Sequence, residues 1–211
     1  MHVIADNWPY LLRAAVNTLW MAAVSIAVST VAGMLFGIGC AVGVRVVRVV
    51  NAVAVWIVRG VPLLVVLFVV YYSLPADLSP YVAAIVALSF YFTFFVSEVV
   101  RGAIQAIPRG QVEAAKSVGL SFWQRMRLVI LPQAVRAAVP PLMNLWVILV
   151  KGTAYASVIS AWELTTASTE VAQRTVAPFP VYGFAMLVYF FICFALTRIG
   201  RAAEARLRYQ H

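Results

Sequence analysis

The chain contains several apolar stretches of roughly 20 residues, a length that soluble domains rarely carry. Hydrophobic residues make up 64% of its 211 residues, and charged residues make up 11%. A helix rises about 1.5 Å per residue, so such a stretch can cross the roughly 30 Å of hydrocarbon in a bilayer. We therefore expect an all-α integral membrane protein of one domain, residues 1–211, with five transmembrane helices. The expected spans lie within residues 11–44, 52–74, 81–100, 135–150 and 181–197.

The basic residues gather in alternate connections between these stretches. The net charge of +9 would suggest a nucleic-acid partner in a soluble protein, but in a membrane protein the distribution of charge reports topology. If the odd-numbered connections face the cytoplasm, only Arg13, Lys151 and Arg174 lie elsewhere. The basic residues on the cytoplasmic side are then Arg45, Arg48, Arg59, Arg101, Arg109, Lys116, Arg125, Arg127, Arg136, Arg198, Arg201, Arg206 and Arg208. The positive-inside rule predicts an N-terminus outside, a C-terminus in the cytoplasm and no nucleic-acid partner.

The residue types that most enzymes and metal sites require are missing from the expected bundle. The two histidines, His2 and His211, are terminal, which leaves no imidazole for a zinc hydrolase or a Ser-His protease in the membrane. No segment matches the phosphate-binding pattern GxxxxGK followed by Ser or Thr, and Cys40 and Cys193 are lone thiols in apolar stretches. We expect no catalytic site, no metal site and no directly bound cofactor.

Three local features interrupt the apolar spans. The sequence RGVP at residues 59–62 should kink or restart the second helix, because its proline lacks an N–H. Gly33 and Gly37 form a small-xxx-small pair, which favours ordinary close helix packing over a specific dimerisation seam. Glu98 and Arg101 lie on one helical face, where a satisfied ion pair is favoured over a functional site.

After the fourth span the apolar character fades, and the sequence predicts a broken helix followed by a short outer helix. The polar run extends from Lys151 to Pro180. Irregular backbone at membrane depth is tolerated only beside protein or a water-filled cavity. If a solute crosses the membrane through this chain, we expect its pathway in this region.

A polar, cationic stretch separates the third and fourth spans. Residues 110–134 read GQVEAAKSVGLSFWQRMRLVILPQA. This pattern predicts two short helices at an angle, the first ended by Gly119 and the second N-capped by Ser121. We expect them to form a compact knuckle on the cytoplasmic side.

The surface of this knuckle is open to two interpretations. Ala114 and Ala115 should be exposed, with Glu113, Lys116 and Arg125 as a charged rim. Small side chains on an exposed turn would allow the groove of a partner protein to close around the backbone. An amphipathic loop lying on the lipid surface fits the same residues equally well.

The same stretch resembles the EAA loop of bacterial ABC importer permeases. The matching residues are Glu113, Ala114, Ala115, Gly119, Leu131 and Pro132, with Val129 in place of the usual isoleucine. The resemblance extends to the polar amino acid uptake branch, the histidine and glutamine permease type. Its motifs are similar to RGVPLL at residues 59–64, EVVRGAI at residues 98–104 and LPQA at residues 131–134. The resemblance covers nearly the whole chain.

This resemblance implies a type I ABC importer permease fold in the bacterial plasma (inner) membrane. The implied function is import of a polar amino acid or a related small solute by alternating access. Residues of about 108–132, Arg125 included, would form the coupling loop. The implied partners are an identical or paralogous permease, two cytoplasmic ATP-binding cassette subunits that hold ATP and Mg, an extracytoplasmic solute-binding protein and membrane lipid.

The resemblance also implies which residues line the solute pathway. Near this pathway the chain differs from the family's motifs at two positions. The implied pathway residues are Glu163 first, within a stretch similar to the family's AEL motif, and then Lys151, Thr153, Ser157 and Ser160. A purely structural role for the hydroxyls is equally open. The chain carries Gly152 and Ala154 where the family commonly has Asp and Ser. Two alternatives therefore remain, a half of a heterodimeric pair without a solute site, or a passive channel or membrane scaffold.

Overall fold

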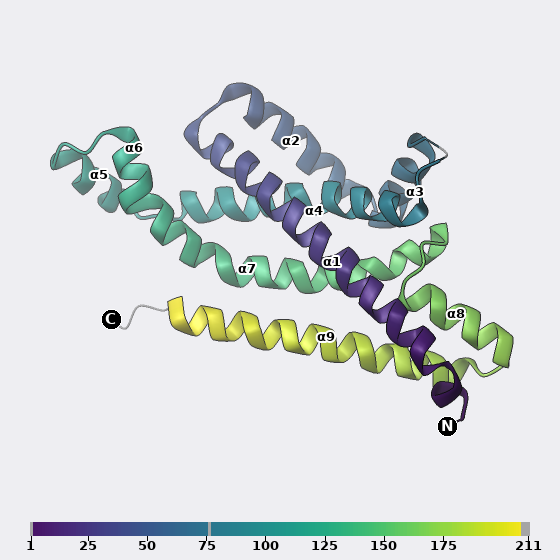
Figure 1. The fold of residues 1–211 in the computed structure, drawn as a ribbon. Helices are drawn as coiled ribbons and strands as arrows, with labels where there is room; N and C mark the ends of the chain where they lie inside the picture. Colours follow the sequence, from purple (N-terminus) through teal and green to yellow (C-terminus); the bar gives the residue numbers. More distant parts are fainter. Residues whose placement is uncertain (1, 76, 208–211) are drawn as a thin grey trace.

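A computed structural model describes residues 2–75 and 77–207, and every regular element in this part of the chain is helical (Figure 1). The elements in chain order are α1 (His2–Val42), α2 (Arg45–Gly60), α3 (Leu63–Ser73), α4 (Pro80–Gln105), α5 (Arg109–Ser117), α6 (Phe122–Arg125), the π-helix η1 (Met126–Ile130), α7 (Leu131–Gly152), the 3₁₀-helix η2 (Thr153–Ile159), α8 (Leu164–Thr175) and α9 (Pro178–Leu207). The helices α5 and α6 lie at the same end of the molecule as the C-terminal end of α9 (Figure 1). The N-terminus, α3 and α8 lie at the opposite end.

The described residues contain the long apolar helices that the sequence predicts. Four of them are long and apolar enough to cross a membrane, and α2 with α3 forms a fifth span if this bent pair is counted as one. The four are His2–Val42, Pro80–Gln105, Phe122–Ile159 and Pro178–Arg206. The prediction of an all-α membrane protein is confirmed, although the helices extend well beyond the apolar windows because flanking polar residues continue them.

The second span is broken rather than kinked. The helices α2 and α3 are bent by 113° at a short break. At this point Pro62 precedes α3, and the Tyr91 hydroxyl donates a hydrogen bond to the Val61 carbonyl at 3.4 Å. A proline cannot donate the helical N–H bond, so the chain restarts as a new helix in a new direction. The RGVP sequence thus separates two helices, and α2 begins at Arg45 rather than near residue 52.

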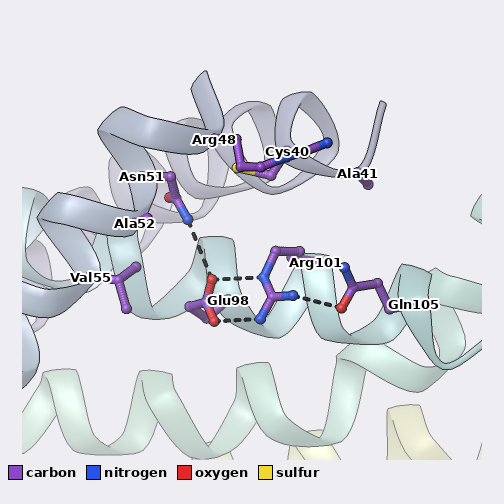
Figure 2. Close-up of a pocket in the computed structure, with 9 residues that line it drawn as sticks. All are labelled: Cys40, Ala41, Arg48, Asn51, Ala52, Val55, Glu98, Arg101 and Gln105. Atoms are coloured by element: carbon purple, nitrogen blue, oxygen red, sulfur yellow. Dashed lines mark hydrogen bonds and ion pairs between the residues drawn. The ribbon is translucent and has the colours of Figure 1, made fainter. Parts of the chain in front are cut away.

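The helix α2 leaves a cavity of about 420 Å³ between itself, the end of α1 and α4 (Figure 2). The chain turns from α1 into α2 at Gly43, whose φ of 94° lies in the left-handed region that favours glycine. This turn brings α2 alongside α1, and the start of α2 forms one wall of the cavity.

The helices α1 and α4 pack closely against each other within this chain. An ideal Cβ on Gly33 would lie 2.5 Å from the Cβ of Val96, and one on Gly37 would lie 2.7 Å from the Cβ of Val100. Contacts this short exclude any side chain, so the two glycines allow the backbones to approach. The preference for ordinary packing over a dimerisation seam is confirmed.

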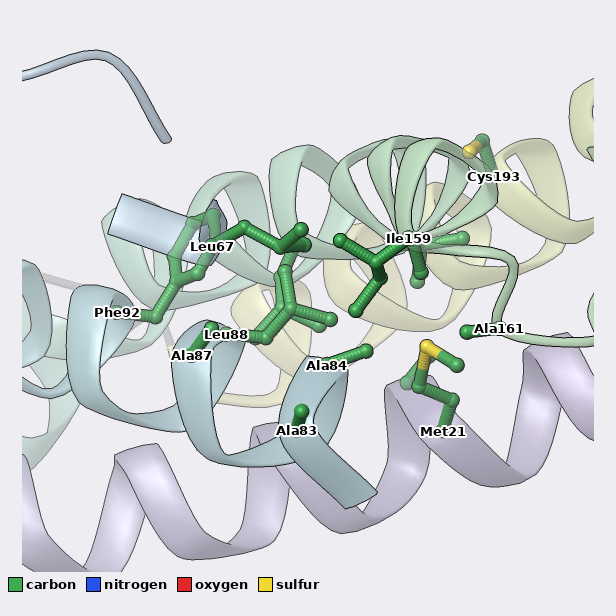
Figure 3. Close-up of a cluster of buried hydrophobic side chains, with 14 residues drawn as sticks. Met21, Leu67, Ala83, Ala84, Ala87, Leu88, Phe92, Ile159, Ala161 and Cys193 are labelled. Carbon is green, nitrogen blue, oxygen red and sulfur yellow. The ribbon is translucent and has the colours of Figure 1, made fainter. Parts of the chain in front are cut away.

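The largest buried cluster lies where α4 crosses α1, α3 and η2 (Figure 3). Ala83, Ala84 and Ala87 of α4 are almost fully buried near Met21 of α1. Lipid tails are as apolar as these side chains, so helices in a membrane associate through close packing rather than through the hydrophobic effect. Small residues on α4 therefore hold the centre of the bundle together.

A π-helix joins the knuckle to the fourth span. The Leu131 N–H bonds to the Met126 carbonyl, five residues back, and Pro132 follows directly. A proline ring clashes with the carbonyl four residues before it in an α-helix. The wider turn of η1 gives this ring room, so the helix continues into the membrane without a break.

Candidate functional site

The first half of the knuckle, α5, ends in a glycine turn. Gly119 has a φ of 79°, and its N–H bonds to the Lys116 carbonyl at 2.9 Å. The Leu120 N–H bonds to the Ala115 carbonyl at 3.1 Å. These bonds satisfy carbonyls at the end of α5, as in other helices that finish with a left-handed glycine. The predicted role of Gly119 as the residue that ends this helix is confirmed.

The second half of the knuckle begins with a reciprocal cap. The Gln124 N–H donates to Ser121 Oγ at 3.4 Å, and the Ser121 N–H donates to Gln124 Oε1 at 2.8 Å. Arg125 Nη1 also donates to the Leu120 carbonyl at 2.6 Å. Because both the turn and the helix start are hydrogen-bonded, the knuckle is built as a rigid unit. The predicted N-cap is confirmed.

The exposure of the knuckle differs from the expectation at one residue. Glu113, Ala114 and Lys116 are exposed as predicted, but Ala115 is only 6% exposed. The helix α5 packs against η1, and Ala115 is its one buried residue. The prediction that both alanines are exposed is therefore wrong for Ala115, because the π-helix η1 packs against α5 on this side.

The outer part of the knuckle presents apolar side chains. Val118 is 75% exposed and Trp123 is 69% exposed, and Phe122 and Leu128 are also exposed. Clustered apolar side chains at the end of a bundle typically mark an interaction surface. Leu131 and Pro132 lie further along, in the first turn of α7, where they connect the knuckle to the fourth span.

The second predicted site lies at the opposite end, where α7 passes into η2 and α8. Thr153 is buried, and its Oγ1 donates to the Val150 carbonyl at 2.7 Å. Ser157 is half-buried, and its Oγ donates to the Ala154 carbonyl at 2.7 Å. Lys151 and Ser160 are exposed. The predicted interruption of the helix and the short helix after it are both confirmed, and the outer position of this short helix stays a prediction.

The short helix α8 is bounded by two residues in the left-handed region. Ser160, at the end of η2, has a φ of 58°, and Val176, which follows α8, has a φ of 52°. Neither residue is a glycine, and a β-branched residue such as valine is especially uncommon there. The chain therefore turns sharply on both sides of α8.

Glu163 is the N-cap of α8 and is 0% exposed. Its carboxylate accepts hydrogen bonds from the N–H groups of Thr165 and Thr166, both at 2.8 Å, and from the Tyr189 hydroxyl of α9 at 2.9 Å. Thr18 of α1 accepts the Leu164 N–H at 3.0 Å beside it. The start of α8 is thus fastened to both α1 and α9.

The environment of Glu163 favours its neutral form. Loss of water around the buried carboxyl raises its pKa, against the lowering effect of the hydrogen bonds from Thr165, Thr166 and Tyr189. By exposure, two of the predicted pathway residues are buried, Thr153 and Glu163, Ser157 is half-buried, and Lys151 and Ser160 are exposed. Direct contact of any of them with a solute stays a prediction.

A third polar cluster was not predicted as a unit. Asn51 of α2 is 2% exposed, and its Oδ1 accepts a hydrogen bond from Ser97 Oγ at 2.6 Å. Its Nδ2 donates to Glu98 Oε1 at 3.4 Å (Figure 2). Arg101 bonds both oxygens of Glu98, at 2.9 and 2.7 Å, and donates to Gln105 Oε1 at 2.6 Å. The interpretation of Glu98 and Arg101 as a satisfied pair is confirmed.

These features define a class of protein, a helical membrane subunit with a rigid knuckle at one end and a broken helix at the other. The family described as "Binding-protein-dependent transport system inner membrane component" matches residues 29–209. The chain belongs to this family. It is a membrane-spanning permease subunit of a transport system, as the resemblance in its motifs implied.

Individual relatives agree with this assignment. The chain is 34% identical over 204 residues to the L-cystine transport system permease protein TcyB of Bacillus subtilis (strain 168), across 95% of this chain and 87% of the relative. It is 32% identical over 205 residues to the glutamine transport system permease protein GlnP of Escherichia coli (strain K12), across 95% and 94%.

Solved structures agree with the fold. A crystal structure of an amino acid ABC transporter with histidines has a chain that matches with a TM-score of 0.89 at 25% identity, over 96% of both chains. An inward-facing structure of the MetNI methionine ABC transporter matches with a TM-score of 0.74 at 25% identity, over 92% of this chain and 95% of the other. The prediction of a type I ABC importer permease fold is confirmed.

Proposed function

We propose that this chain forms the membrane pathway of an ATP-driven importer that brings a polar amino acid or a related small solute into the cytoplasm. The relatives named above transport cystine and glutamine, and the similar structures belong to transporters of amino acids and methionine. ATP and Mg would be held by two partner ATP-binding cassette subunits. A second permease, identical or paralogous, and an extracytoplasmic solute-binding protein would complete the complex.

The observation that carries this proposal is the capped knuckle α5–α6. The turn between its two helices is fixed by Gly119 and Ser121, and its outer face is exposed and partly apolar. A partner that grips such a unit can move it without deforming it, and η1 continues it directly into α7. Closure of the ATPase subunits would then rock the spans between outward-facing and inward-facing arrangements.

We propose that the knuckle and the C-terminus face the cytoplasm and the N-terminus faces outside. The support is the distribution of basic residues, together with the position of the knuckle at the same end of the molecule as the C-terminal end of α9 (Figure 1). A reporter fused after α9, or a cysteine placed in the knuckle and labelled from one side, tests this orientation.

For the solute path we propose the interruption between α7 and α8, where Lys151 and Ser160 are exposed. Thr153, Ser157 and Glu163 border the same interruption. Glu163 would reach a solute only by exchanging its present partners for solute hydrogen bonds, which requires α8 to move. Solute affinity that is unchanged by Glu163→Gln in an assembled complex removes this residue from the path.

One observation favours the alternative in which this chain is the half of a heterodimeric permease pair that lacks a solute site. An ideal Cβ on Gly152 would lie 3.2 Å from Leu63 Cδ2, 3.5 Å from Leu88 Cδ2 and 3.8 Å from Phe92 Cε2. The position is thus surrounded by apolar side chains, which would not solvate a charged solute group. A mass measurement on the purified complex distinguishes the two cases, since a heterodimer contains two permease species.

Two alanine variants test the coupling role. Gly119 and Gly110 each have no atom within 4 Å of an ideal Cβ, but only Gly119 has a positive φ. Gly119→Ala should strain the turn by roughly 1–2 kcal/mol and lower uptake relative to ATP hydrolysis, whereas Gly110→Ala should leave both unchanged. Normal uptake by an assembled Gly119→Ala complex contradicts the coupling role. A purified complex without any ATPase subunit would favour a passive channel or scaffold instead.

A further inference from the structure

The cavity between α1, α2 and α4 lies at an end of the bundle, where α1 finishes and α2 begins (Figure 2). Its wall includes Cys40 near the end of α1, Arg48 in the first turns of α2, and Arg101 and Gln105 in the last turns of α4. Residues at the ends of membrane-spanning helices lie at the depth of the lipid headgroups. The cavity therefore opens at a membrane surface, whichever side of the membrane that is.

The charges around the cavity do not cancel. Glu98 and Arg101 compensate one another through two hydrogen bonds, and the remaining Arg101 contact is with Gln105 Oε1. Arg48 is exposed on the same wall, and within residues 2–75 and 77–207 no carboxylate forms a salt bridge with it. Arg45 precedes it by three residues on the same side of α2. The cavity is left with a net positive charge.

The amide of Gln105 adds hydrogen-bond donors. Its Oε1 is occupied by Arg101 Nη1 at 2.6 Å, so the NH₂ group of the same amide remains for another partner. Arg48 and this NH₂ group line one cavity from two different helices. A guanidinium with nearby N–H donors is the arrangement that binds phosphate oxygens.

An apolar stripe runs beside this cationic wall on α2. Trp56 is 85% exposed, and Val49 and Val53 are also exposed. Spacings of three and four residues place these side chains on one face of α2, adjacent to the face of Arg48. A tryptophan next to arginines is typical of the boundary between headgroups and acyl chains. A free phosphate would use the cationic wall alone, whereas a lipid would use both surfaces.

We propose that this cavity binds the phosphate headgroup of an anionic phospholipid, with an acyl chain lying along the stripe of Val49, Val53 and Trp56. Arg48 supplies the charge and Gln105 supplies neutral donors. A cavity of about 420 Å³ is large enough for a headgroup phosphate and its glycerol. The lipid would link α2 to the end of α4, from which the chain continues into α5.

The test is to count the lipids that the purified complex retains. The complex is exchanged into phosphatidylglycerol or phosphatidylcholine, and bound lipid is counted by native mass spectrometry. The wild type should retain phosphatidylglycerol preferentially. Arg48→Gln should reduce this preference about fivefold, the effect of one basic residue at an anionic surface. Arg48→Lys should preserve most of it, and Arg206→Gln, which removes an exposed charge from α9, should leave it unchanged.

Gln105→Glu gives a second, sharper variant. The carboxylate can still accept the hydrogen bond from Arg101, but it replaces the NH₂ donors with a negative charge, so retention of phosphatidylglycerol should be lost. Size-exclusion profiles of both variants report whether the complex is assembled.

Three results would overturn the proposal: equal retention of the two lipids by the wild type, displacement of phosphatidylglycerol by inorganic phosphate, or a cysteine at position 48 that cross-links to a second permease. The last result would mean that a protein covers this face. None of these measurements needs ATP or solute, so their outcome is separate from that of the proposed import function.

Discussion

The two ends of the molecule hold a carboxylate in opposite ways. Glu98 is partly exposed beside a cavity and is paired with Arg101. Glu163 is fully buried and is held by two backbone N–H groups and the Tyr189 hydroxyl. The first arrangement uses a compensating charge, whereas the second uses the N-terminus of a helix and neutral donors. The comparison indicates that the Glu163 end resists change, while the Glu98 end remains open to ligands and to rearrangement.

The largest effect should follow loss of the buried carboxylate. Glu163→Ala leaves the N–H groups of Thr165 and Thr166 without their carboxylate acceptor in a closed site and leaves the Tyr189 hydroxyl with Thr165 Oγ1 alone, which should destabilise the complex by roughly 3 kcal/mol. Thermal unfolding of the purified complex measures this loss. Glu163→Gln is the matched variant and should cost less, because its carbonyl oxygen keeps one acceptor. Equal stability of wild type and Glu163→Ala would remove the contrast between the two ends.

A smaller effect is expected from the residue that joins α2 to α4. Asn51→Ala removes the acceptor of Ser97 Oγ and a donor to Glu98, and should cost about 1–2 kcal/mol. Asn51→Asp restores an acceptor for Ser97 but places a second carboxylate next to Glu98, so it should not restore stability. Unfolding in denaturant, followed at the tryptophans, measures both variants.

The ion pair between Glu98 and Arg101 should contribute less to the free energy of unfolding than Asn51 does. Glu98 and Arg101 are a partly exposed i,i+3 pair, so Glu98→Gln should cost about 0.5 kcal/mol, and less at high salt. The same unfolding measurement at low and high salt tests this. A loss as large as that of Glu163→Ala would show that the Glu98 end is closed as tightly as the other.

The last expected effect is a change in the stability of the complex with pH. Because burial raises the pKa of Glu163, its contribution to stability is greatest below the pKa of an unfolded glutamate, about 4.3, and declines as the pH rises through the folded value. Wild type should therefore lose stability relative to Glu163→Gln between mildly acidic and neutral pH. Melting temperatures of the two complexes across this range test the sign, and a wild-type stability that rises relative to that of Glu163→Gln as the pH increases contradicts it.

Features set by nearby residues could be predicted from the sequence. Gly119 and Ser121 act within a few residues of themselves, and both were identified correctly. The proline of RGVP likewise marks the break of the second span, although the size of the bend depends on what α2 and α3 pack against. The spacing of Gly33 and Gly37 indicated close helix packing, but it did not identify α4 as the partner helix.

Features set by distant residues could not be predicted. Asn51 and Glu98 are 47 residues apart, and only the packing of α2 on α4 brings them together. A single asparagine among valines was the available signal, since an amide in an apolar helix face requires a partner. Ala115 is buried by a π-helix that follows it, and Glu163 has distant partners in Thr18 of α1 and Tyr189 of α9 besides the N–H groups of its own helix.

The two sharp turns at Ser160 and Val176 have a consequence for motion. Each left-handed residue with a side chain stores on the order of 1 kcal/mol, and α8 lies between them. Rotation of either backbone into a commoner conformation would release that energy and swing α8 as one piece. The Tyr189 hydrogen bond to Glu163 opposes this motion together with two bonds from α8 to α1, which join Leu164 to Thr18 and Arg174 to Asn7. Contacts at both ends of α8 thus hold the helix in a strained position.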